Sequence, residues 1–261
     1  MKESTGKRKL TPVSIFHYIR LCYRGALFLT ALVIYVIGKM HGKDMLTSSL
    51  KQKPAILWVI WLVFTVDMLM RFFPSKIESP GCQKQFRRNY LKSGEINIEI
   101  QDNNATMLVA LLWICFNLVF GCLHMVGILD EGFMILLCCA YSVCDMICIL
   151  FFCPFQTWFL KNKCCSTCRI YNWDFAMMFT PLFFIQNAFT WGLLAQSLIL
   201  MIRWEITFYR HPERFSEKTN EYLRCANCTE KLCSHKKQLH SLWEHVADFY
   251  AKRARFLRKD S

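Results

Sequence analysis

The chain has 261 residues, of which 54% are hydrophobic, and it carries 15 cysteines and a formal net charge of +13. A soluble domain of this size does not need apolar runs of about 20 residues, so the composition favours a membrane protein whose main partner is the lipid bilayer. The basic excess does not indicate nucleic acid, because no recognition module is visible and Lys and Arg commonly flank membrane spans on the cytoplasmic side. An odd number of cysteines, many of them in apolar runs, fits reduced thiols better than a disulfide framework.

Four apolar stretches predict transmembrane helices. The first, 25–38, is short, and the long side chain of Arg24 just before it is expected to reach the membrane interface. The second, 54–73, has the length that a hydrocarbon core of about 30 Å requires. The third and fourth, 105–129 and 132–153, are joined by a short acidic turn.

A fifth apolar stretch, 174–209, is too long for one ordinary span and barely long enough for two. If it crosses once, the Lys and Arg residues divide into 15 and 17 on the two sides, which gives no bias. If it enters and returns as a hairpin or re-entrant pair, 28 lie on one side and 4 on the other. Because Lys and Arg concentrate on the cytoplasmic side, the hairpin is favoured, with both termini in the cytoplasm. Gln186, Asn187 and Gly192 lie near its middle, where a turn needs polar or flexible residues.

The fold class that follows is all-α. We expect a multi-pass protein of the cell membrane with about four clear transmembrane helices plus the fifth segment, which together form a helical transmembrane domain over 1–210. A basic, cysteine-containing cytoplasmic tail covers 211–261. Apolar residues recur at helical spacing over 239–250, which predicts an amphipathic helix that lies on anionic lipid or packs over the cysteines.

Two cysteine clusters flank the fifth stretch, and each contains a Cys-x-x-Cys pair. Such a pair places two thiolates within reach of one tetrahedral ion. Four of these thiolates suit zinc or an iron–sulfur cluster equally well, and the sequence leaves the choice between them open. The expected ligands are Cys165, Cys168, Cys225 and Cys228, with Cys164, Cys233 and His235 as further candidates.

Asp145 is the other candidate site residue. It lies deep in the fourth apolar stretch, between Cys144 and Cys148, where an ionisable group is costly and commonly functional. Asp145 is therefore a candidate proton site, with a packing role as the alternative.

The sequence supports three functions and names no reaction or catalytic residue. The first is electron transfer by a cytoplasmic iron–sulfur site to a redox or membrane protein partner or to a carrier in the membrane. The second is a transporter or channel-like protein with a structural zinc site. The third is a membrane scaffold without chemistry.

Overall fold

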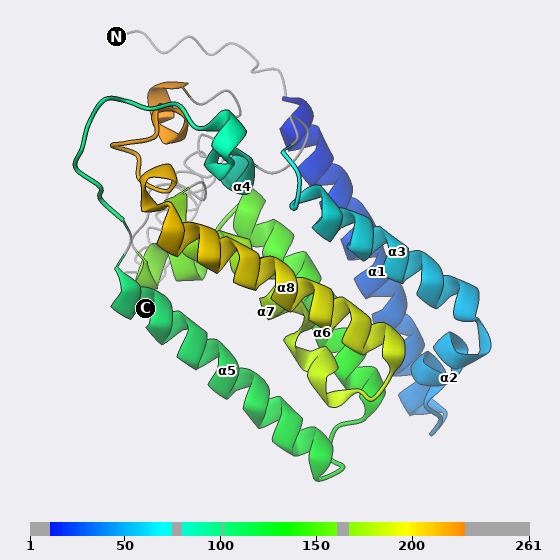
Figure 1. Cartoon of the computed structure of the whole chain (residues 1–261). Helices are drawn as coiled ribbons and strands as arrows, with labels where there is room; N and C mark the ends of the chain where they lie inside the picture. Colours follow the sequence, from blue (N-terminus) through cyan, green and yellow to red (C-terminus); the bar gives the residue numbers. More distant parts are fainter. Residues whose placement is uncertain (1–10, 75–79, 101, 161–166, 228–261) are drawn as a thin grey trace, which may run out of the picture.

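The computed structural model describes residues 11–74, 80–100, 102–160 and 167–227, and in these ranges the chain is helical without strands (Figure 1). Its α-helices are α1 (Pro12–Met40), α2 (Met45–Gln52), α3 (Pro54–Met70), α4 (Pro80–Gln85), α5 (Asn103–Met125), α6 (Glu131–Leu150), α7 (Asp174–Phe179) and α8 (Ala188–Arg210). Short 3-10 turns are η1 (Arg87–Asn89), η4 (Arg169–Trp173), η5 (Thr180–Phe184), η6 (Pro212–Arg214), η7 (Glu221–Leu223) and η8 (Cys225–Asn227), and η2 (Phe155–Phe159) is a π-helical turn.

The structure confirms the all-α class, and three described helices are long and apolar enough to cross a membrane: α1, α5 and α6. The expectation of four clear spans plus a fifth is not confirmed. α3 is strongly apolar but has 17 residues, and α8 has 23 residues but is less apolar because it contains Arg203 and Glu205.

The first helix begins much earlier than the predicted boundary at residue 25. The side chain of Thr11 caps α1 by accepting a hydrogen bond from the backbone N–H of Ser14, and Pro12 occupies the first helical position, where no N–H is needed. The expectation that Arg24 reaches the interface is wrong, because its side chain is fully buried inside the bundle.

The fifth apolar stretch folds back on itself. α7 and η5 form its first arm, the chain turns at 185–187, and α8 forms the second arm. At the open end, Arg169 and Trp173 hydrogen-bond to Glu205, while at the turn the hydroxyl of Thr190 donates to the backbone carbonyl of Ile185. The stretch is therefore a hairpin in space, and its turn lies where the polar residues predicted one.

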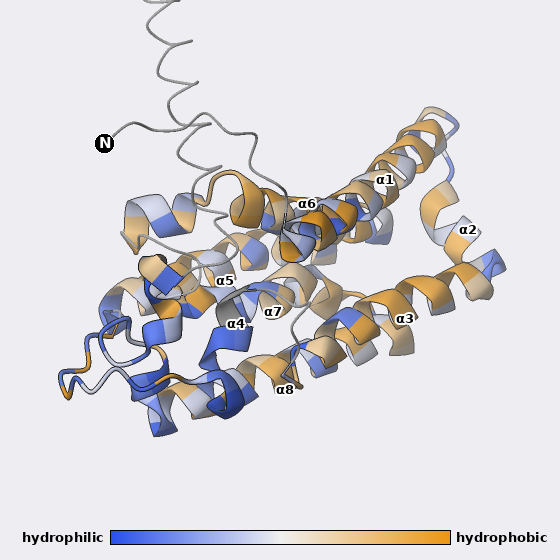
Figure 2. Cartoon of the chain, turned by 90° about the horizontal axis from the view of Figure 1, so that it is seen from above, coloured by the Kyte–Doolittle hydropathy of each residue, from blue (hydrophilic) through white to orange (hydrophobic). Residues whose placement is uncertain are grey.

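One end of the bundle is covered by a polar cap, which we define as residues 83–100 and 211–224. Asn220 joins its two segments, since its side-chain amide donates to the carbonyls of Lys84 and Arg214 and its backbone pairs with Lys92. Figure 2 shows hydrophilic residues gathered in this cap and hydrophobic residues along α1 and α3. α1 begins and α8 ends at the capped end (Figure 1).

At the opposite end, Lys39 of α1 pairs with Asp130, which precedes α6, at 2.6 Å. Burial raises the pKa of the Asp130 carboxyl, but hydrogen bonds from Lys39 and from the backbone N–H of Phe133 outweigh it and hold that pKa below its ordinary value.

The core is aromatic, and the outer surface is apolar. Phe64, Phe175, Phe179 and Trp204 are buried between α3, α7 and α8. Large aliphatic side chains lie exposed along α3, α5 and α8, among them Val59, Leu62, Leu111, Ile114, Val119, Ile199 and Ile202. An apolar interior combined with an apolar exterior is the pattern of a helix bundle that is solvated by lipid.

Candidate functional site

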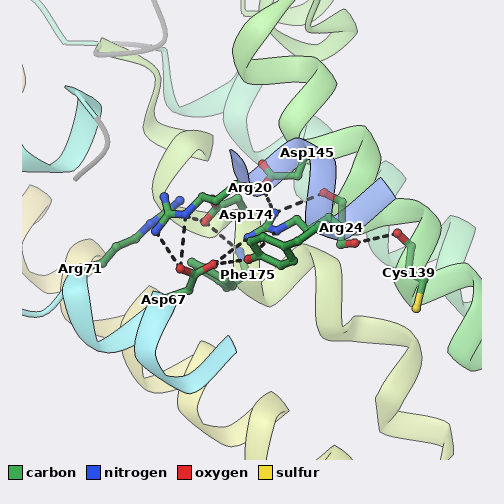
Figure 3. Close-up of polar contacts among 10 residues, drawn as sticks. Arg20, Arg24, Asp67, Arg71, Cys139, Asp145, Asp174 and Phe175 are labelled. Atoms are coloured by element: carbon green, nitrogen blue, oxygen red, sulfur yellow. Dashed lines mark hydrogen bonds and ion pairs between the residues drawn. The ribbon is translucent and has the colours of Figure 1, made fainter. Parts of the chain in front are cut away.

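A network of charged side chains is buried where α1, α3, α6 and α7 meet near the capped end (Figure 3). Its first two members are Arg20 and Arg24, which lie one helical turn apart on the same face of α1. Both guanidinium groups are essentially inaccessible, with 1% and 0% of the side chain exposed. Because neither guanidinium group is accessible to water, each needs a hydrogen-bond acceptor within the protein.

Asp67 of α3 is the acceptor for the first of these arginines. Its Oδ1 accepts from Arg20 Nη2 at 2.9 Å, and its Oδ2 accepts from the hydroxyl of Tyr23 at 2.7 Å. Arg24 Nη2 lies 3.5 Å from the same Oδ2. One carboxylate thereby joins both arginines of α1 to the end of α3.

Arg24 also connects α1 to α6. Its Nη1 donates to Asp145 Oδ2 at 2.9 Å and to the backbone carbonyl of Ser142 at 3.2 Å. Asp145, the candidate proton site from the sequence, is thus the ion-pair partner of an arginine 121 residues earlier in the chain.

Arg71 completes the network from the end of α3. Its Nη1 donates to Asp174 Oδ1 of α7 at 2.6 Å, and its guanidinium lies 4.6 Å from the ring centre of Phe175. The six ionisable residues are three arginines and three aspartates, so their formal charges cancel. Burying them still costs several kcal/mol of desolvation per ion, which is why such groups in a membrane bundle commonly mark a functional site.

A cavity of about 230 Å³ lies next to the network, between α5, α6, α7 and the turns η2 and η4. Its wall is almost entirely apolar and aromatic, with Trp113 packed 4.6 Å from Tyr141 and 6.3 Å from Phe155, measured between ring centres. Of the six network residues in the described chain, Asp145 and Asp174 line the cavity, and the three arginines and Asp67 do not. The two network residues that line the cavity are therefore both acidic, although the network as a whole is neutral.

Asp174, which lines the cavity, has one carboxylate oxygen without a partner among the described residues. Asp174 Oδ1 accepts from Arg71 and from the backbone N–H of Phe175, but Asp174 Oδ2 is buried without a hydrogen bond among the described residues. A buried acceptor without a donor is costly, so this atom is a place where a ligand hydrogen-bond donor would be stabilising.

Four cysteines also line the cavity: Cys144, Cys148, Cys153 and Cys168. Cys168 belongs to the metal site expected from the sequence, and it is buried beside η4. Cys225 begins η8 at the capped end. The other expected ligands lie outside the described residues: Cys164, Cys165, Cys228, Cys233 and His235.

Within the described ranges, no group of three or more His, Cys, Asp or Glu side chains could hold a metal ion. Since most of the expected ligands lie outside these ranges, the cysteine-ligated site and the choice between zinc and iron–sulfur stay predictions. The expected amphipathic helix over 239–250 also lies outside them.

A second cavity, of about 240 Å³, lies between α1, α2, α3, α6 and α8. Its wall includes Ile34, Trp61, Phe64 and Leu193 and contains no charged side chain among the described residues. Its polar lining consists of neutral side chains such as Thr30, Ser49 and Thr190, whereas the first cavity is lined by two carboxylates that can orient a ligand, so the first cavity is the better candidate site.

Arg20, Arg24 and Asp174 are site residues that were not expected from the sequence. A signal was present for two of them, because arginines four residues apart at the start of an apolar run share one helix face. Asp174 gave no such signal, since it stands at the boundary of an apolar stretch where aspartate commonly caps a helix.

Comparison with known proteins gives no relative: no family model matches the chain, and no curated protein or solved structure is significantly similar to it. The function is therefore argued from the geometry alone.

Proposed function

We propose that this chain is a multi-pass membrane protein, with both termini in the cytoplasm, that binds a small, mainly apolar compound in the cavity beside Asp174. Three helices of spanning length and the exposed aliphatic side chains of α3, α5 and α8 support the membrane location. The hairpin of α7 and α8 supports the orientation, because α8 returns the chain to the end of the bundle at which α1 begins (Figure 1).

The observation that carries the proposal is an apolar cavity lined by Asp174, whose Oδ2 has no hydrogen-bond partner among the described residues. Ligand sites in proteins combine an apolar lining with a few polar groups that fix orientation, and this cavity has that composition. An apolar cavity of about 150 Å³ is large enough for benzene. A space of about 230 Å³ thus suits one ring with a short side chain.

The charge at the wall selects the head group of the ligand. Asp145 and Asp174 both line the cavity, and their arginine partners do not. An ammonium or a hydroxyl can donate to Asp174 Oδ2, whereas a ligand carboxylate would meet two like charges. We therefore assign the ligand to apolar amines and alcohols or phenols.

Three compounds with the same ring and different heads test this assignment: 2-phenylethylamine, 2-phenylethanol and phenylacetate. A ligand that binds the folded state at a hundred times its Kd raises the free energy of unfolding by about 2.7 kcal/mol. The amine and the alcohol should raise the midpoint of thermal unfolding of the detergent-solubilised protein, and phenylacetate should not.

Asp174→Asn should abolish the stabilisation by the amine, because the amide of the variant is neutral and presents its own donors. Asp130→Asn is the matched control, since it makes the same change at the far end of the bundle and Asn caps helices as well as Asp does. Equal stabilisation by all three compounds, or an unchanged response in Asp174→Asn, would contradict the proposed site.

A second function, metal binding by the two cysteine clusters, has one supporting observation. Cys168 precedes η4, which is joined to the cap by the hydrogen bond from Asn172 to Gln85, and Cys225 begins η8 directly after the cap, so one metal shell could include residues from both clusters. Metal analysis of protein purified without chelators or oxygen tests it. Cys168→Ser should lower bound zinc or iron, while Cys138→Ser, at a buried cysteine of α6, should not. Wild-type protein without either metal would contradict it.

A further inference from the structure

Cys148 and Cys153 form a pair of thiols on the cavity wall. Cys148 lies in the last turn of α6, and Cys153 lies three residues beyond its end. The two thiols interact with each other, and Cys153 Sγ also accepts from the backbone N–H of Gln156 at 3.5 Å. Both side chains line the cavity, and both are partly buried.

The end of α6 explains how residues five apart come into contact. In a continuous helix, residues at i and i+5 lie on different faces. Here the backbone N–H groups of Phe151 and Phe152 both donate to the carbonyl of Ile147, so the chain curls back over the last turn. The thiol of Cys153 thereby returns to that of Cys148.

We propose that Cys148 and Cys153 are a redox-active dithiol and that its oxidant is a small quinone bound in the cavity. This inference rests on the proposed function, since the hydroquinone that the reaction forms is a phenol and belongs to the ligand class assigned to the cavity. The aromatic side chains Trp113, Tyr141 and Phe155 provide faces on which a flat ring can stack. The reduced form, a hydroquinone, carries the hydroxyl donor that Asp174 Oδ2 lacks.

The reaction balances within these components. The two S–H bonds of Cys148 and Cys153 break, one S–S bond forms, and two protons and two electrons are released. The quinone ring accepts the two electrons, and each of its carbonyl oxygens gains one proton, which gives the hydroquinone. Asp145 lies on the same wall one helical turn before Cys148, so it is positioned to carry a proton between thiol and ring.

The test uses full-length protein, reduced and purified in detergent without oxygen, and duroquinone as the probe. All four ring positions of duroquinone are methylated, so thiol addition to the ring is suppressed and oxidation is measured instead. The expected result is stoichiometric hydroquinone in the absorption spectrum and a loss of two hydrogens from the peptides that contain Cys148 and Cys153.

Cys148→Ser and Cys153→Ser should each reduce hydroquinone formation to the level of buffer. Cys115→Ser is the control, because Cys115 is an exposed cysteine of α5 outside the cavity lining, and this variant should react like wild type. If the soluble oxidant diamide forms the disulfide but duroquinone does not, the quinone is the wrong oxidant class. If neither forms it, the dithiol assignment is wrong.

The outcomes also separate this inference from the proposed function. Binding of the phenyl amine and alcohol without thiol oxidation overturns the redox step and leaves the ligand site standing. Failure of the amine, the alcohol and duroquinone to stabilise the fold removes both.

Discussion

Removing Arg24 should destabilise the fold more than removing an exposed charge. Its guanidinium is fully buried and donates to Asp145 at 2.9 Å and to the carbonyl of Ser142 at 3.2 Å. In Arg24→Met the apolar volume is largely kept, but Asp145 loses the partner that neutralises it. Breaking a buried ion pair by removing one partner costs about 3–5 kcal/mol. At about 2–4 °C per kcal/mol for a chain of this size, the midpoint of thermal unfolding should fall by roughly 6–20 °C.

A double variant separates the lost ion pair from lost packing. Arg24→Met combined with Asp145→Asn removes both charges of the ion pair. The double variant should therefore lose less free energy of unfolding than the sum of the two single variants, by about 0.5–3 kcal/mol. Circular dichroism of the detergent-solubilised proteins measures both midpoints. Lys39→Met is the control, because Lys39 also pairs with an aspartate but is 54% exposed and should change the midpoint little. A midpoint of Arg24→Met equal to that of the control, or no recovery in the double variant, would refute a buried, mutually dependent network.

Two further predictions follow from packing and from charge. Gly121→Ala should destabilise the protein by about 1–3 kcal/mol, because its Cβ would lie 2.1 Å from the ring of Phe184. Gly25→Ala, in α1 with nothing within 4 Å, should be neutral or stabilising, and equal midpoints for the two variants would show that α5 and η5 do not pack as described. Reporter fusions at the two chain ends should both be active in the cytoplasm, since the proposed topology, in which the fifth stretch enters and returns, would put 28 basic residues on one side and 4 on the other. A tail reporter active only on the opposite side would contradict the hairpin.

The helical class and the hairpin could be predicted because their signals are local. Apolar runs of spanning length mark the helices, and Asn187 at the turn caps α8 by accepting from the backbone N–H of Phe189 at 3.0 Å. Asp145 was found for the same reason, since a carboxylate inside an apolar run stands out without knowledge of the fold.

The site as a whole could not be predicted, because its members come from four helices. The partners of Arg24 lie 43 and 121 residues away, and that of Arg71 lies 103 residues away. Charged residues in the N-terminal part of α1 favour a span that begins later in the sequence. In the structure, however, Arg20 and Arg24 are buried because distant carboxylates compensate their charges. The cavity likewise depends on where α6 ends and on how η4 packs against it. The spacing of apolar residues along the sequence predicts neither feature.

The most direct test of the ligand site is photolabelling with an aryl diazirine that bears a primary amine, followed by identification of the labelled residues by mass spectrometry. Labels are expected on the cavity wall, at residues such as Tyr141, Cys148 and Tyr171. They should be reduced by competition with 2-phenylethylamine and lost in Asp174→Asn. Labels confined to the exposed faces of α3 and α8, with no competition by the amine, would contradict a ligand site beside Asp174.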